Sequence, residues 1–219
     1  LPDIVGGSFL WSYGPSTSSS ISVSPVITTS YNVLYDLNGC VSTTSGTVVV
    51  NPIPTVTLSS SVICDGDSAI LTATPSGVGG VFTWMPGGVG PSTLTVSPTT
   101  TTSYSVDYTL NGCVSTSATG NVVVNPIPQV TLPNITICAG DNAILTATPS
   151  IPGGVYTWNP GGIGSQTISM NPLSNSTIDV TYELNGCTSS VASSQITVNP
   201  LPVVTFSADT LLGCSPISV

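Results

Sequence analysis

Cysteine is the residue type in this sequence with the most reactive side chain, because its thiol can form a disulfide, bind a metal ion or act as a nucleophile. The 219 residues contain no histidine and no CxxC motif, so metal binding by these cysteines is the weaker interpretation. Recurrent cysteines in a chain of this composition predict disulfides and an oxidising compartment. The six candidates are Cys40, Cys64, Cys113, Cys138, Cys187 and Cys214.

The carboxylates offer a second kind of chemistry. Asp65 and Asp67, in "CDGD", are the only close acidic pair, and the corresponding "CAGD" segment has Ala139 and Asp141. Aspartate suits a hard cation such as calcium, but one pair cannot supply the roughly six to eight ligands that calcium takes. We therefore predict a turn in which Asp side chains bond nearby amides. A weak calcium site is the alternative, and no other cofactor is expected.

The missing cations exclude several classes of function. The chain has 9 acidic residues and no lysine, arginine or histidine, which gives a formal charge of −9 and a pI of about 4.1. Proteins that bind nucleic acid or anionic lipid need Lys or Arg. General acid–base catalysis usually recruits His, and an activated nucleophile needs a base or a nearby cation, so we expect no enzyme. No apolar run approaches the roughly 20 residues of a membrane span.

The sequence repeats with a period of about 74 residues. Trp11, Trp84 and Trp158 are 73 and 74 positions apart, "NPIP", "NPIP" and "NPLP" recur at intervals of 74, and "AILTATPS" occurs twice. Such a period indicates an array of equivalent domains. We expect the chain to be an internal piece of a longer one. The predicted segments are the end of a first repeat at 1–54, a second repeat at 55–128, a third repeat at 129–202 and the start of another at 203–219.

Each repeat is predicted to consist of strands. In "TSYSVDYTL" the side chains of Tyr104, Val106 and Tyr108 alternate with polar ones, which is typical of a strand with one buried face. The "NG" that follows predicts a type I′ hairpin turn. Six or seven short strands in about 74 residues favour a small antiparallel β-sandwich. We expect the Trp and Tyr side chains to form its core, with a ligand groove as the alternative.

The cysteines fall into two positional classes, and two pairings stay open. A local pairing would join Cys64 to Cys113 and Cys138 to Cys187, with Cys40 and Cys214 paired outside the chain. In a standard immunoglobulin-type sandwich, however, the two classes lie at opposite ends, about 25 Å apart along a strand, whereas a disulfide needs Cα atoms within about 7 Å. The alternative joins Cys64 to Cys187 of the following repeat. Free thiols are the third interpretation.

Taken together, "ICDGDSAILTATP", "YTWNPGG", "NGC" and "ITVNPLP" resemble the tandem immunoglobulin-like and PKD-like repeats of very large surface proteins of Bacteroidota. That group includes gliding-motility adhesins and other cargo of the type IX secretion system. The chain has "WMPGG" and "WNPGG" where PKD domains have "WDFGDG", which favours the immunoglobulin-like relatives.

The resemblance implies tandem immunoglobulin-like sandwiches in the stalk of an exported adhesin at the bacterial cell surface. Its expected partners are neighbouring repeats, the outer-membrane secretion or motility machinery, and a surface ligand or polysaccharide at a distant tip. The alternative is that the repeats themselves bind carbohydrate or another ligand. The resemblance also implies O-glycosylation at Asp-Ser/Thr motifs, for which Ser68 in "DSA" and Thr210 in "DTL" are the candidates.

Overall fold

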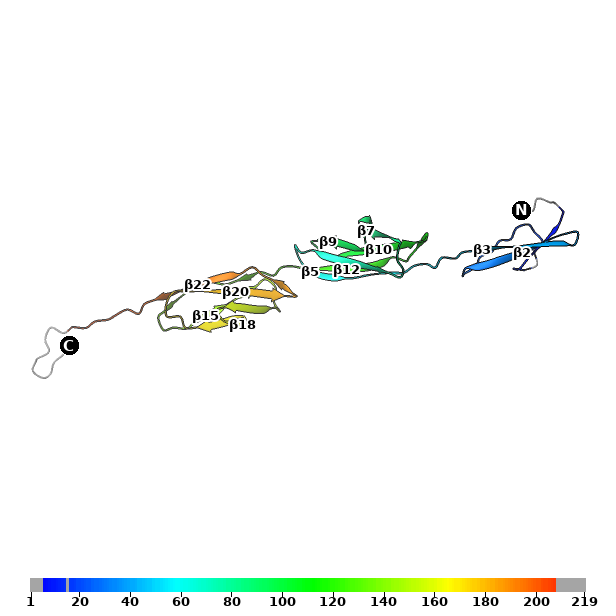
Figure 1. Cartoon of the computed structure of the whole chain (residues 1–219). Helices are drawn as coiled ribbons and strands as arrows, with labels where there is room; N and C mark the ends of the chain where they lie inside the picture. Colours follow the sequence, from blue (N-terminus) through cyan, green and yellow to red (C-terminus); the bar gives the residue numbers. More distant parts are fainter. Residues whose placement is uncertain (1–5, 15, 208–219) are drawn as a thin grey trace, which may run out of the picture. The chain divides into compact units, whose positions relative to one another are not determined.

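The computed structural model describes residues 6–14 and 16–207 (Figure 1). The regular elements in this part of the chain are β-strands. None of the described residues lies in a helix that is long and apolar enough to cross a membrane.

The second repeat contains nine strands in two sheets. The smaller sheet has the order β4-β6-β9, and the larger has the order β5-β12-β10-β7-β8, with β11 paired to β10. The strands are β4 (Val56–Leu58), β5 (Ser61–Cys64), β6 (Ala69–Pro75), β7 (Val81–Met85), β8 (Gly88–Gly90), β9 (Thr93–Val96), β10 (Thr102–Leu110), β11 (Cys113–Val114) and β12 (Ala118–Asn125).

The third repeat has the same arrangement. Its larger sheet has the order β14-β22-β20-β17-β18, with β21 paired to β20. The facing layer of the sandwich consists of two strand pairs, β13-β16 and β15-β19. The strands are β13 (Val130–Thr131), β14 (Ile135–Cys138), β15 (Ala143–Thr146), β16 (Thr148–Pro149), β17 (Val155–Asn159), β18 (Gly162–Gly164), β19 (Thr167–Met170), β20 (Ser176–Leu184), β21 (Cys187–Thr188) and β22 (Ala192–Asn199).

This strand order is that of an immunoglobulin-like sandwich. The neighbouring strands β7, β10 and β12 correspond to the central strands of one immunoglobulin sheet, and β4, β6 and β9 form the facing sheet. The short strand β14 runs parallel to β22, with Ile135 opposite Ile196 and Cys138 opposite Asn199. The predicted fold class, tandem immunoglobulin-like antiparallel sandwiches, is confirmed.

The first repeat contributes a three-stranded antiparallel sheet of order β1-β2-β3. Its strands are β1 (Ser8–Trp11), β2 (Thr29–Leu37) and β3 (Cys40–Val48). Strand β2 is equivalent to β10 and β20, because each ends at an Asn-Gly turn.

Contacts divide the described chain into two compact units. One holds the described residues up to Ser61 together with Ala69–Val96 and Thr102–Val122, and the other holds Val62–Ser68, Ser97–Thr101 and the described residues from Val123 onward. Cys64 and the end of β12 therefore belong to the same unit as the third repeat. The repeat boundaries given above stay predictions of the sequence.

The core of each complete repeat consists of the same positions. In the third repeat, Trp158 is 3% exposed and Tyr182 is fully buried. The apolar residues around them are Val130, Ala143, Leu145, Ala147, Tyr156, Ile178, Val180 and Ile196. In the second repeat, Trp84 and Tyr108 are buried at the equivalent positions. The interpretation of Trp and Tyr as core residues is confirmed for both complete repeats.

The three Asn-Gly turns have the predicted backbone conformation. Asn111 has φ 50° and Gly112 has φ 80°, and the pairs at 38–39 and 185–186 are likewise positive at both positions. Two positive φ angles define the type I′ turn, whose twist matches that of the flanking strands. Each turn therefore leads directly into the strand that begins with a cysteine.

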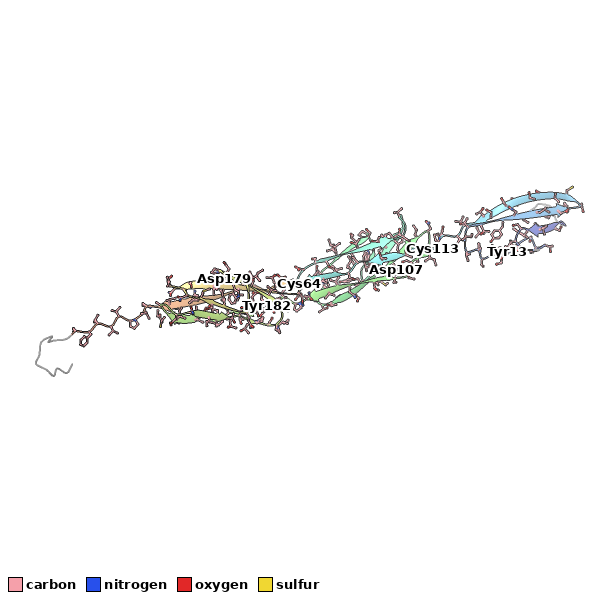
Figure 2. The ribbon with its side chains drawn as sticks, turned by 90° about the horizontal axis from the view of Figure 1, so that it is seen from below. Tyr13, Cys64, Asp107, Cys113, Asp179 and Tyr182 are labelled. Atoms are coloured by element: carbon pink, nitrogen blue, oxygen red, sulfur yellow. A yellow bond between two sulfur atoms is a disulfide. The ribbon has the colours of Figure 1, made fainter. Side chains whose placement is uncertain are left out.

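A buried tyrosine hydroxyl fixes the loop before β17 (Tyr182 is labelled in Figure 2). The Tyr182 hydroxyl donates to the carbonyl oxygen of Ile151 at 2.7 Å and accepts from the amide of Gly154 at 2.6 Å. A Cβ at Gly154 would lie 2.1 Å from the carbonyl oxygen of Glu183, so only glycine fits there. Tyr108 makes the same two bonds to Gly77 and Gly80 in the second repeat.

We expect Tyr182→Phe to lower the free energy of unfolding of the third repeat by about 1–3 kcal/mol, because the amide of Gly154 and the carbonyl oxygen of Ile151 both lose their hydrogen-bond partner. Urea unfolding measures this change. Tyr13→Phe is the control, since Tyr13 is 62% exposed. Equal stability of the Tyr182→Phe variant and the parent chain would show that the hydroxyl does not hold the loop.

Burial raises the pKa of Tyr156, and the neighbouring phenol of Tyr182 raises it further. Their ring centroids are 4.8 Å apart. A tyrosine in an unfolded chain ionises near pH 10. Because the folded state keeps this proton to a higher pH, the stabilisation is complete below about pH 10 and is lost as the pH rises through the folded pKa.

We therefore expect the free energy of unfolding to fall above about pH 10. Tyr156→Phe should make this fall shallower. The measurement is a series of urea titrations on protein whose free thiols have been alkylated, so that thiol ionisation does not contribute. Parallel pH profiles for the two proteins would contradict the assignment to Tyr156.

Two strands of each complete repeat were not predicted from the sequence. Strands β5 and β8 lie at the two edges of the larger sheet of the second repeat. Strand β5 consists of "SVIC", and β8 lies within "PGGVG". Because β5 comes before the strand that carries "AILTAT", Trp84 lies on the fourth strand of its repeat.

Candidate functional site: the Cys64–Cys187 bridge

Cys187 lies directly after the third Asn-Gly turn. The turn brings the chain back so that Cys187 pairs with Leu184 at the end of β20. Asn185 and Gly186 supply the two positive φ angles, 52° and 79°. The Cys187 side chain is only 1% exposed, so its sulfur is held at the end of the sheet and shielded from solvent.

Cys64 lies at the last position of β5. The amide of Asp67 donates to the carbonyl oxygen of Cys64 at 3.0 Å, and Gly66 has φ 92°. A hydrogen bond from the fourth residue to the first, with glycine at the third position, is typical of a type II turn. The amide of Asp65 donates to the carbonyl oxygen of Asn125 at 2.9 Å. This bond places the turn beside the end of β12.

The two cysteines form a disulfide, of which Cys64 is labelled in Figure 2. Their Cα atoms are 5.7 Å apart and their sequence separation is 123. That Cα distance is within the usual range for a disulfide. The bridge joins a residue of the second repeat to a residue of the third, and both residues belong to the same compact unit.

The residue that begins the "NPIP" segment completes the site. The side-chain amide of Asn125 donates to the carbonyl oxygen of Asn185 at 3.1 Å. The sulfur of Cys187 lies 3.9 Å from the carbonyl oxygen of Asn125, and the sulfur of Cys64 lies 3.7 Å from that of Gly186. Asn125 therefore contacts the Asn-Gly turn through both its side chain and its backbone, on the side where the disulfide forms.

Asn125→Ala should loosen this contact without removing either cysteine. One hydrogen bond contributes about 0.5–1.5 kcal/mol, so we expect the disulfide to be reduced roughly two- to tenfold faster by a small dithiol. Trapping of the released thiols with an alkylating reagent over time measures the rate. Asn121→Ala, on an exposed position of β12, is the control. Equal reduction rates in the Asn125→Ala variant and the parent would show that Asn125 does not secure the bridge.

The structure contains the second of the two predicted pairings, and the local pairing is wrong. Strand β12 runs antiparallel to β10, with Thr102 opposite Val122 and Val106 opposite Ala118. The Asn-Gly turn with Cys113 therefore lies at the start of β12, whereas Cys64 lies beside its end. The two cysteines of one repeat are thus at opposite ends of one sheet.

Three other cysteines carry free thiols among the described residues. Cys40 and Cys138 are exposed and Cys113 is half-buried. The local partners predicted for Cys113 and Cys138 are used by the Cys64–Cys187 disulfide. Partners for Cys40 and Cys214 beyond the chain stay a prediction, and Cys214 lies outside the described residues.

The acidic pair lies in the turn itself. Asp65 and Asp67 are both exposed and lie in the predicted backbone turn, whereas hydrogen bonds from nearby amides to their carboxylates stay a prediction. In the equivalent turn of the third repeat, the carboxylate of Asp141 accepts from the amide of Cys138 at 3.4 Å. Residues 6–14 and 16–207 contain no group of three or more His, Cys, Asp or Glu side chains that could hold a metal ion.

Ser68, the first glycosylation candidate, is exposed, and its hydroxyl shares a hydrogen bond of 2.8 Å with the hydroxyl of Ser97. Thr210 lies outside the described residues. Glycosylation at both positions stays a prediction.

A hollow of about 410 Å³ lies on the sheet of the first repeat. Its apolar lining comes from Phe9, Trp11, Val33 and Tyr35. By the repeat period, Trp11 corresponds to Trp84, and Tyr35 corresponds to the buried Tyr108. In the second repeat that face packs against the sheet β4-β6-β9. The hollow therefore lies on the face of the first repeat's sheet that is equivalent to the core face of the second repeat. Among the described residues, no second sheet covers this face in the first repeat.

No family model and no curated protein sequence matches the chain. Solved structures similar to it include extracellular domains 3–5 of Drosophila OTK, at 13% identity, covering 78% of this chain and 71% of that one, with a TM-score of 0.46. A variant of three titin immunoglobulin domains matches at 11% identity, 78% and 75% coverage and a TM-score of 0.44. The four N-terminal immunoglobulin domains of Dscam1 match at 14% identity, 78% and 54% coverage and a TM-score of 0.33. At such identities the likeness concerns the fold alone, and by its own strand order the chain is an array of immunoglobulin-like repeats.

Proposed function

We propose that this chain is a structural segment in the stalk of a large exported surface protein, in which tandem immunoglobulin-like repeats hold a distant binding tip away from the cell. The observation that carries the proposal is the disulfide between Cys64 and Cys187. A disulfide within one repeat would stabilise that repeat alone. A disulfide from one repeat to the next restricts the movement of one against the other, which is what a stalk requires.

Two further observations support a structural role. The aromatic side chains of residues 55–202 are buried or half-buried, so these repeats present no exposed aromatic ring on which a sugar could stack. The charge of −9 without any cation makes neighbouring stalks repel one another. The disulfide also favours an oxidising location outside the cell.

The finer identity rests on the repeat motifs described above, which resemble those of Bacteroidota surface adhesins. On that basis the protein is a cell-surface adhesin that serves adhesion or gliding motility. Its partners are then the neighbouring repeats, the outer-membrane secretion or motility machinery and a ligand at the tip. The competing function is direct binding of carbohydrate or another ligand by the repeats.

Two measurements test the proposal. Antibodies against the chain should label intact cells that make the parent protein, and the purified chain should bind no glycan on an array. Failure to label intact cells in which the protein is detected after lysis would contradict the surface location. Saturable binding of a glycan by the chain would replace the stalk with the competing function, and Trp11→Ala would then test whether the hollow on the first repeat is the site.

A further inference from the structure

The free thiols of Cys113 and Cys138 occupy the same repeat positions as the two paired cysteines. Cys138 lies 74 positions after Cys64, and Cys187 lies 74 positions after Cys113, which is the repeat period. One cysteine of each class therefore forms a disulfide and its equivalent does not. If their surroundings are also equivalent, the thiols of Cys113 and Cys138 are positioned to form a disulfide of the same kind.

The surroundings of Cys113 reproduce those of Cys187. The side-chain amide of Asn51 donates to the carbonyl oxygen of Asn111 at 3.2 Å, as Asn125 does to Asn185 at 3.1 Å. The thiol of Cys113 donates to the carbonyl oxygen of Asn51 at 3.7 Å. The Asn-Gly turn is thus already docked on the preceding "NPIP" segment, although Cys113 has no disulfide.

The surroundings of Cys138 reproduce those of Cys64. The amide of Ala139 donates to the carbonyl oxygen of Asn199 at 2.8 Å, and the amide of Asp141 donates to the carbonyl oxygen of Cys138 at 3.1 Å. The corresponding bonds at Cys64 are 2.9 and 3.0 Å long. Cys138 is exposed whereas Cys64 is half-buried, as expected for a position with no docked turn beside it.

We propose that Cys113 and Cys138 are each one half of a further disulfide of the Cys64–Cys187 type. Cys138 pairs with the cysteine after the Asn-Gly turn of the next repeat, and Cys113 pairs with the cysteine that ends the β5-type strand of the preceding repeat. Cys40 belongs to the same class as Cys113. This inference rests on the proposed stalk, since it requires further repeats on either side.

The bond forms by thiol–disulfide exchange with a small-molecule disulfide such as oxidised glutathione. One protein thiolate attacks the oxidant, releases one glutathione thiolate and forms a mixed disulfide. The second protein thiolate then attacks the protein sulfur of that mixed disulfide and releases the second glutathione thiolate. Two protein thiols are oxidised, one disulfide is reduced, and the two protons pass to the glutathione thiolates.

A lengthened chain tests the pairing of Cys138. A second copy of residues 129–202 is inserted after Pro202, and the protein is oxidised with glutathione, alkylated and cleaved without reduction by chymotrypsin, since the chain has no site for trypsin. We expect Cys64 joined to the original Cys187, and Cys138 joined to the cysteine of the inserted copy that corresponds to Cys187. Cys138 of the inserted copy should carry the alkyl label.

Cys138→Ser in the lengthened chain is the matched control, and it should leave the Cys187 equivalent of the inserted copy alkylated. An alkyl label on the original Cys138, or its linkage to Cys113, overturns the inference whatever happens at Cys64. This failure is distinguishable from failure of the proposed stalk, because absence of surface labelling on cells would leave the pairing in the lengthened chain unchanged.

Discussion

Replacing both cysteines of the bridge, as Cys64→Ser with Cys187→Ser, is expected to lower the free energy of unfolding of the third repeat by about 4 kcal/mol. While the second repeat is folded, the bond from the Asp65 amide to the Asn125 carbonyl holds Asn125 beside Cys64. The loop that the disulfide closes in the unfolded third repeat then runs from Asn125 to Cys187, a separation of 62 residues. A closed loop of that size loses entropy that corresponds to about this energy.

Scanning calorimetry of the double variant checks this value, and for a domain of this size the melting temperature should fall by roughly 15 °C or more. Cys113→Ser with Cys138→Ser is the matched control, because it removes two thiols and leaves the disulfide in place. The prediction fails if the two double variants melt at the same temperature, since the bridge would then restrict nothing in the unfolded chain.

Trp158→Ala is expected to destabilise the third repeat by about 3–5 kcal/mol, because it leaves a cavity in the centre of the core. Trp158 is 3% exposed, and its indole N–H donates to the carbonyl oxygen of Ser165 at 3.0 Å. The substitution therefore also leaves that carbonyl without its partner. A loss of this size is a large part of the 5–15 kcal/mol that typically stabilises a small domain.

Hydrogen exchange followed by mass spectrometry locates the effect of Trp158→Ala. Amides of β15, β20 and β22 should lose protection, whereas those of β6 and β10 in the second repeat should keep it. Ile163→Ala serves as the control, since Ile163 is 78% exposed. Unchanged protection of β20 in the Trp158→Ala variant would mean that this ring is not central to the core.

Local sequence patterns determined much of the fold. The alternation in β10 and β20 was visible because each buried position is apolar and each intervening one is polar, and Asn-Gly is one of few pairs that adopt positive φ at both positions. Because the repeats recur every 74 residues, the core positions predicted in one repeat also predicted those of the next. These features depend on neighbours in the sequence, so the sequence alone was sufficient to predict them.

The edge strands and the disulfide depended on distant residues. Strand β5 has four residues, and Val62 within it is 63% exposed, so no burial pattern distinguishes it from a connection. Its position is decided by pairing with β12, far along the chain. The pairing of β5 with β12 places Cys64 beside Asn125 and far from Cys113. Because this pairing joins distant parts of the chain, the spacing of the cysteines in the sequence left two disulfide pairings open.

The Cys64–Cys187 disulfide also decides which part of the chain bears a pulling force. When the two ends are drawn apart, tension passes from Cys64 through the sulfur atoms to Cys187, and the residues between them lie outside its path. That stretch, with its separation of 123 residues, would span roughly 400 Å if fully extended. With the disulfide intact, neither complete repeat can release this length, and the chain resists stretching even if a sandwich unfolds. Reduction would make it extensible.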